Sequence, residues 1–149
     1  MRAVLQRVRS ASVTVDGEVV GEIGVGFLVL LGIEVGDSDA DLAYIVDKTA
    51  AVRVFADGEG RMNVDITQVG GGLLVVSQFT LAGDCRKGRR PSWDGAARPD
   101  EARAWYERAL SAWRALGLPV EAGIFQADMQ VALVNDGPVT LLLDSRKQF

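Results

Sequence analysis

The sequence predicts a mixed α/β fold for residues 1–149: one domain of mostly antiparallel β-sheets, forming a barrel-like core, with two helices packed on it. Three observations support this prediction. Short apolar or alternating segments bounded by turn residues occur throughout the chain, as in antiparallel sheets. Two longer segments repeat apolar side chains at helical spacing. No internal repeat, low-complexity tract or linker divides the 149 residues, a length that suits one domain.

The first third of the chain is expected to form strands. Val4–Val8 and Ser12–Val15 alternate in polarity, and Asp16-Gly17 is typical of a two-residue hairpin turn. Glu18–Ile23 would be the return strand of that hairpin. Phe27–Ile33 is almost entirely apolar, which predicts a strand that is buried on both faces.

A first helix is predicted over Asp39–Phe55. It would begin at Ser38, because Asp41 stands three residues later, as in a capping box. Two further strands are expected after it, over Met62–Ile66 and Leu73–Leu81.

A second helix is predicted over Pro99–Leu116, because proline suits a first helical turn and Gly117 supplies a stop. Two final strands are expected over Ala122–Val134 and Val139–Leu143. The residues between them, Asn135–Pro138, are usual turn residues, so the simplest interpretation is a hairpin loop. Proline cannot donate to a sheet ladder, which places this segment at a turn or an edge.

The composition excludes several classes of catalyst. The chain has no histidine, which removes Ser-His-Asp and Cys-His catalysis and most zinc sites. Cys85 is the only cysteine, so it has no disulfide partner in the chain and is expected to be an ordinary thiol. No cofactor or metal site is predicted.

The sequence shows neither a membrane span nor a signal peptide, so we expect a cytoplasmic protein.

Four basic residues lie within a loop predicted over Ala82–Pro99. The net charge is −4, but Arg86, Lys87, Arg89 and Arg90 occur together with no acidic residue among them. Such a cluster suits one localised phosphate contact better than a long nucleic-acid footprint. A solvated loop explains the same residues equally well, so composition alone leaves both interpretations open.

The segment Ser77–Leu81 places polar side chains at the end of an apolar strand. A rigid strand end can present catalytic groups, although Ser77 and Thr80 could also simply bind nearby backbone groups.

Together with Asn135–Thr140, this segment marks a resemblance to the D-aminoacyl-tRNA deacylase family. The resemblance covers nearly the whole chain and includes Gln6-Arg7-Val8, Ala11-Ser12-Val13, Gly21–Gly24, Arg90-Pro91-Ser92 and Ala127-Asp128-Met129. Trp93 departs from the pattern, which has phenylalanine there.

The resemblance implies a homodimer with two active sites at the subunit interface. The Gly137-Pro138 pair would be cis and would enter the partner's pocket, where it excludes L side chains. The substrate would be D-aminoacyl-tRNA, with glycine as a further candidate amino acid. The expected catalytic residues are Ser77, Gln78, Phe79 and Thr80; Met129 and Asn135 would join Gly137 and Pro138 in binding substrate, and Arg86, Lys87, Arg89 and Arg90 would bind tRNA.

A mechanism follows from this resemblance. Backbone N–H groups near Gln78, Phe79 and Thr80 would stabilise the tetrahedral oxyanion while water attacks the ester. The adenosine 2′-hydroxyl would handle the proton, and the Thr80 hydroxyl would assist. Two alternatives stay open: a non-catalytic module that binds the tRNA terminus, and a serine esterase in which Ser77 is activated by Lys48 or Lys87.

Overall fold

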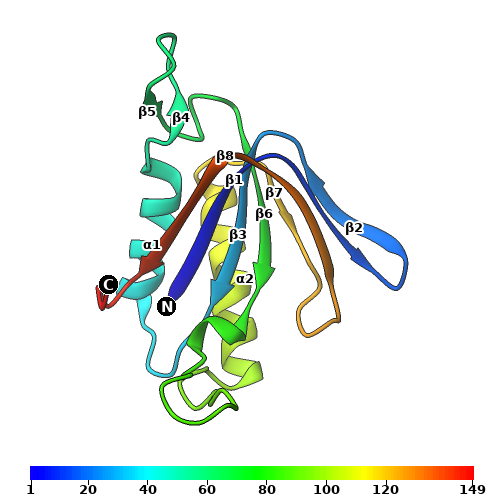
Figure 1. Cartoon of the computed structure of the whole chain (residues 1–149), viewed down its shortest axis with the longest axis vertical. Helices are drawn as coiled ribbons and strands as arrows, with labels where there is room; N and C mark the ends of the chain where they lie inside the picture. Colours follow the sequence, from blue (N-terminus) through cyan, green and yellow to red (C-terminus); the bar gives the residue numbers. More distant parts are fainter.

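The computed structural model describes all residues from 1 to 149, and its fold is mixed α/β with a barrel-like sheet, as predicted (Figure 1). The elements in chain order are β1 (Arg2–Val15), β2 (Glu18–Ile23), β3 (Gly26–Gly32), α1 (Asp39–Ala51), β4 (Phe55–Ala56), β5 (Met62–Val64), β6 (Gly72–Ser77), the 3₁₀ helix η1 (Phe79–Ala82), α2 (Pro99–Ala115), β7 (Val120–Ala122) and β8 (Gln130–Asp144).

The main sheet has the strand order β2-β1-β3-β6-β7, with β8 on the other edge of β1. β1 pairs antiparallel with β2, β3 and β8, whereas β3–β6 and β6–β7 are parallel pairs. Parallel neighbours need long crossovers, and α1 and α2 lie within the two that occur here. The predicted hairpin at Asp16-Gly17 is confirmed, with φ of 50° and 83° at its two residues.

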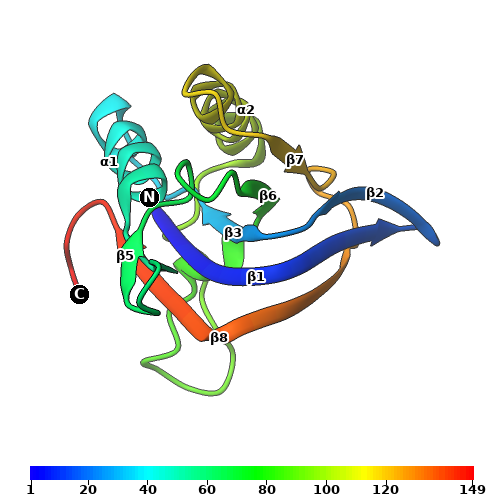
Figure 2. The same cartoon turned by 90° about the horizontal axis from the view of Figure 1, so that it is seen from above.

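Both helices cover the same face of the sheet (Figure 2). The larger core lies between them and the sheet, and it includes the fully buried Trp113 and Phe27. A smaller core forms on the opposite face around Leu28, Leu74 and Val76. Strands β3 and β6 contribute to both cores, which confirms that the segment Phe27–Ile33 is buried on its two faces. None of the helices is long and apolar enough to cross a membrane.

The prediction of a first helix through Phe55 is wrong at its end. The helix ends at Ala51, and Val52 follows in an extended conformation. Phe55 is nevertheless buried, because it begins β4 and its ring lies 5.0 Å from the ring of Phe27. The apolar pattern therefore continues through the helix end, while the backbone changes from helix to strand.

The expected strand over Leu73–Leu81 is too long. β6 ends at Ser77, and the Gln78 N–H makes a last hydrogen bond of 2.8 Å to the Leu31 carbonyl. Its neighbour β3 ends at Gly32, so no ladder partner is left and the chain turns into η1.

The predicted hairpin between two final strands is also wrong. β8 runs without interruption from Gln130 to Asp144, and both of its halves pair antiparallel with β1. Asn135 is opposite Val8 and Thr140 is opposite Gln6, so residues 136–139 form a bulge in one long strand. This bulge leaves Pro138 outside the ladder, which satisfies the constraint that proline imposes. The first part of the expected strand Ala122–Val134 is the separate strand β7 and a loop.

Candidate active site

A cavity of about 690 Å³ lies beside the end of β6. Its walls come from the ends of β3 and β6, the start of η1, the N-terminal turn of α2 and the loop from Phe125 to Met129. Twelve of its 17 lining residues are hydrophobic. A concave, mostly apolar site of this size with a few polar groups is typical of small-ligand binding.

The cavity brings together four of the residues predicted from the sequence: Ser77, Gln78, Phe79 and Met129. Thr80 lies next to them, is exposed, and accepts a hydrogen bond from the side-chain amide of Gln78. The Gln78 N–H is committed to the Leu31 carbonyl, so the N–H groups of Phe79 and Thr80 are the remaining candidate oxyanion donors.

The cavity residues that were not predicted from the sequence include Trp93, Arg98 and Phe125. The Trp93 ring stands edge-on to Phe79, with 5.4 Å between the ring centroids. Phe125 lies 5.8 Å from the Tyr106 ring. These residues are 16–48 positions away from Ser77, and no local pattern links them to it. The aromatic Trp93 within a charged loop is the one signal that could have identified a member of this group.

The strand behind the cavity is held by a buried hydrogen bond. Tyr106 on α2 donates its hydroxyl to the Val75 carbonyl at 2.8 Å. Burial raises the pKa of Tyr106 to about 12, against a smaller lowering by Arg114. The hydroxyl therefore stays protonated as the donor, and it fixes β6 two residues before Ser77.

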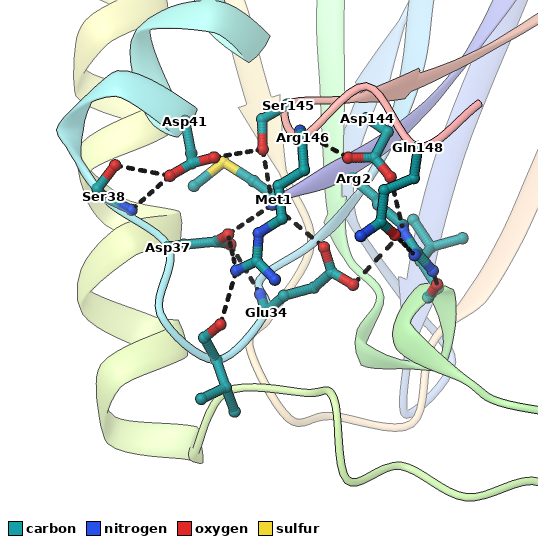
Figure 3. A network of polar contacts seen from close by, with 12 residues as sticks. Met1, Arg2, Glu34, Asp37, Ser38, Asp41, Asp144, Ser145, Arg146 and Gln148 are labelled. Carbon is teal, nitrogen blue, oxygen red and sulfur yellow. Dashed lines mark hydrogen bonds and ion pairs between the residues drawn. The ribbon is translucent and has the colours of Figure 1, made fainter.

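The far side of η1 is held by a polar network at the start of β1 (Figure 3). The Arg2 guanidinium donates to the Leu81 carbonyl at 3.0 Å, and its Nε lies 3.3 Å from Asp144 and 3.4 Å from Glu34. Asp144 is buried, and so is Glu34. Because Leu81 belongs to η1, the network supports the segment that carries Phe79 and Thr80.

The Asp41 carboxylate belongs to the same network (Figure 3). Partial burial alone would raise the pKa of Asp41, but hydrogen bonds from Ser145 and Ser38 outweigh it and lower this pKa to about 2. The predicted capping box of Ser38 and Asp41 at the start of α1 is confirmed.

The bulge residues predicted to bind substrate do not line this cavity. The Gly137-Pro138 bond is cis, and both residues are exposed. Asn135 braces the bulge instead, because its side-chain oxygen accepts a hydrogen bond of 2.8 Å from the Val139 N–H. Arg7 donates to the Asp136 carbonyl at 2.8 Å and also to the carbonyl that precedes β4. A single chain therefore does not bring the two groups of predicted site residues together.

The four basic residues predicted to bind tRNA are exposed in the loop between η1 and α2. Arg86 is paired with Asp84 at 2.7 Å, and the Arg86 side chain lowers the pKa of Asp84 to about 2. Lys87, Arg89 and Arg90 have no ion pair. These three residues are therefore the cations that the loop offers to a ligand.

The lysines considered as bases for Ser77 are not placed to serve it. Lys48 lies on α1, where its ammonium is 5.9 Å from the Tyr44 ring, and Lys87 lies in the exposed loop. Neither lysine lines the cavity, and no hydrogen bond joins either one to Ser77. This geometry disfavours the serine esterase alternative.

Comparisons with known proteins identify the family of the chain. A family model described as D-Tyr-tRNA(Tyr) deacylase matches residues 4–144. D-aminoacyl-tRNA deacylase from Desulfitobacterium hafniense is 61% identical over 149 residues, which is 100% of both chains. The protein of the same name from Geobacter metallireducens is 57% identical over 147 residues, covering 99% of this chain and 97% of that one.

Solved structures show the same fold. One described as a c-Myc DNA unwinding element binding protein superposes with a TM-score of 0.91 at 40% identity, covering 97% of this chain and 98% of the other. A second, of a probable eukaryotic D-amino acid tRNA deacylase, has a TM-score of 0.78 at 18% identity and covers 95% and 97%. At that identity the second likeness concerns the fold alone. With a family model matching almost the full length and relatives above 50% identity, this chain belongs to the D-Tyr-tRNA(Tyr) deacylase family.

Proposed function

We propose that this chain is a hydrolase that cleaves the ester between a D-amino acid and the 3′-terminal adenosine of tRNA. The observation that carries the proposal is the cavity beside Ser77, Gln78 and Phe79, in a chain of this family. The close relatives named D-aminoacyl-tRNA deacylase support the same substrate class. The proposal places the activity in the cytoplasm, where tRNA is charged and used.

The chemistry needs little from side chains, because an aminoacyl ester is already activated. The N–H groups of Phe79 and Thr80 stabilise the oxyanion that forms when water attacks the carbonyl carbon. Loss of one such donor in other enzymes slows the reaction by about 10²–10³-fold. The 2′-hydroxyl of the adenosine passes a proton from the attacking water to the departing 3′-oxygen, so that the amino acid leaves as its carboxylate and the tRNA regains its 3′-hydroxyl. The Thr80 hydroxyl, oriented by Gln78, assists.

Side-chain and backbone catalysis are distinguished by Ser77→Ala and Thr80→Ala in single-turnover hydrolysis. Backbone catalysis predicts losses of about tenfold or less, because neither substitution removes an N–H group. A loss near 10⁴-fold in either variant would contradict it and would favour a nucleophilic hydroxyl.

Selection for D-amino acids is proposed to work by exclusion. In a homodimer, Gly137 and Pro138 of one subunit enter the cavity of its partner and occupy the space that an L side chain would need. Rejection by a clash discriminates more sharply than added contacts do. Two observations support this arrangement: the two residues are exposed, and they lie outside the cavity of their own chain. Glycine, which lacks a side chain, would be accepted.

The function is tested by adding D-tyrosyl-tRNA and L-tyrosyl-tRNA separately and measuring the release of free tyrosine. We expect rapid release from the D ester and little from the L ester. Equal rates would overturn the proposed selectivity. Tight tRNA binding without release from the D ester would instead favour the non-catalytic binding module. Light scattering of the same sample measures whether the chain is a dimer.

A further inference from the structure

Arg98 is the only charged residue among those that line the cavity, and no carboxylate lines it. The residue occupies the N-cap position of α2, and its side chain makes no capping hydrogen bond there. It forms no ion pair either. The cavity wall therefore contains one cation that no group of the protein neutralises.

The other arginines of α2 have partners. Arg103 lies 4.6 Å from the Phe125 ring centroid, Arg108 pairs with Asp39, and Arg114 donates to the Val120 carbonyl at 3.3 Å. Arg98 thus differs from the three arginines on the same helix. Its position at the cavity and its lack of a partner make it available to a ligand.

Arg98 is exposed, so its guanidinium keeps contact with solvent while it also lines the cavity, and a ligand bound there can meet it. Removing water from an unpaired charge costs free energy unless an opposite charge replaces the water. The planar guanidinium presents several N–H donors in a fixed geometry that matches phosphate oxygens in pairs. The cavity is therefore suited to a ligand with one anionic group near Arg98, attached to a larger uncharged body that contacts the apolar walls.

We propose that Arg98 binds the 5′-phosphate of the nucleotide whose aminoacyl ester is cleaved. This inference rests on the proposed function. A volume of about 690 Å³ is in the range that accommodates a small ligand such as an aminoacyl-adenosine. The uncharged adenosine and amino acid occupy the cavity, and the phosphate that continues into the tRNA chain meets Arg98. Arg98 is distinct from the Arg86–Arg90 loop, which is exposed and lines no part of the cavity.

The inference is tested by measuring the binding of 5′-AMP and of adenosine by calorimetry, which needs no turnover. The wild type should bind 5′-AMP more tightly than adenosine. Arg98→Ala should weaken 5′-AMP binding by about 10–100-fold, the range of a hydrogen bond to a charged group, and leave adenosine binding unchanged. Arg98→Lys should retain part of the difference. Arg114→Ala, at the other end of α2, is the matched control and should bind like the wild type.

A second measurement uses the 3′-D-tyrosyl ester of adenosine, with and without a 5′-phosphate. Arg98→Ala should raise KM for the phosphorylated ester alone and leave kcat unchanged. If 5′-AMP and adenosine bind equally to the wild type, or if Arg98→Ala affects both alike, the inference is wrong while the deacylase proposal stands. If the phosphate preference depends on Arg98 but no ester is cleaved, the proposed function fails and the phosphate site remains. If hydrolysis of a 3′-D-aspartyl ester of adenosine depends on Arg98 although the 5′-phosphate is absent, Arg98 binds the acidic side chain of the amino acid instead. That result would overturn the inference.

Discussion

The two polar segments that interrupt apolar strands, Ser77–Ala82 and Asn135–Val139, have opposite surroundings. The first begins beside a walled cavity, and its supports are buried: Tyr106 holds the preceding strand, and Arg2 reaches η1 from a network of buried carboxylates. The second is a bulge on an outer strand, braced by exposed hydrogen bonds from Arg9 and Asn135 and by partly buried ones from Arg7. The first segment lines a cavity. The second is exposed at Gly137 and Pro138 and lines no part of that cavity.

The two segments also lie at different ends of the sheet. η1 and the basic loop are at the end away from the β4–β5 hairpin (Figure 1). The bulge is near the base of that hairpin, because Arg7 donates both to Asp136 and to the residue before β4. If both segments belong to one site, as the family resemblance implies, two copies of the chain must supply them.

The largest expected effect comes from damaging each segment separately and then mixing the variants. Gly137→Ala adds a methyl group 2.8 Å from Val139 and 3.0 Å from Arg7, at a φ of 140° that side chains rarely adopt. Ala127→Trp places an indole in the cavity, whose lining includes Ala127. Either change alone should lower the rate on D-tyrosyl-tRNA by at least about 10²-fold, because a distorted Gly137 segment or a filled cavity misplaces the ester relative to the N–H groups of Phe79 and Thr80.

Mixing the two variants should restore activity if each site combines one segment from each subunit. Random exchange makes half of the dimers mixed, and each mixed dimer has one intact site, so the rate should reach about a quarter of that of the wild type. Circular dichroism of each variant checks that it is folded. If the mixture is only as active as the two separate variants added together, both segments act within one chain.

The basic loop beside η1 should contribute to affinity and not to chemistry. Arg89→Ala with Arg90→Ala should weaken tRNA binding by about tenfold and make it less sensitive to salt, with a slope smaller by about 1.5 if two phosphate contacts are lost. Hydrolysis of aminoacyl-adenosine should not change. Arg53→Ala with Arg61→Ala removes the same charge from the β4–β5 hairpin and the segment just before it, and should leave tRNA binding unaltered. Unchanged affinity in the loop variant would identify the loop as ordinary solvated surface.

Buried and exposed supports should differ in their effect on stability. Tyr106→Phe leaves the Val75 carbonyl without its buried partner and should lower the free energy of unfolding by about 1–3 kcal/mol. Arg9→Ala removes an ion pair of 3.0 Å from the bulge, but the Arg9 side chain is 75% exposed, so the loss should be below about 1 kcal/mol. Urea unfolding measures both. Equal losses would show that the bulge is supported as firmly as the cavity.

The same comparison explains which features could be predicted from sequence. β3 and the start of β6 were identifiable because burial on both faces requires a continuous apolar run. The bulge was mistaken for a hairpin because Asn135–Pro138 suits either structure. Only the shared partner β1 distinguishes them, and pairing with a strand more than 120 residues away leaves no local pattern.

The cavity could be predicted only in part for a related reason. Ser77, Gln78 and Phe79 were identifiable because polar residues follow an apolar strand directly. Arg98 reaches the cavity through the α2 crossover between β6 and β7, and Phe125 reaches it from the loop after β7, so their place depends on how these elements pack. A tertiary arrangement of this kind has no signature within a single segment.

The smallest expected effect is a pH dependence that the polar network behind η1 adds to stability. Because the pKa of Asp41 is lowered from 3.8 to about 2 in the folded chain, its carboxylate stabilises the fold above the unfolded value. This contribution is lost as the pH falls from about 4 through about 2. Asp41→Asn should therefore cost less than about 1 kcal/mol at pH 6, since Asp41 is partly exposed, and the cost should shrink toward pH 2. Asp47→Asn, an exposed residue on the same helix, is the control for urea unfolding at each pH. A cost that is constant with pH would show that the hydrogen bonds of Asp41 to Ser38 and Ser145 do not depend on its charge.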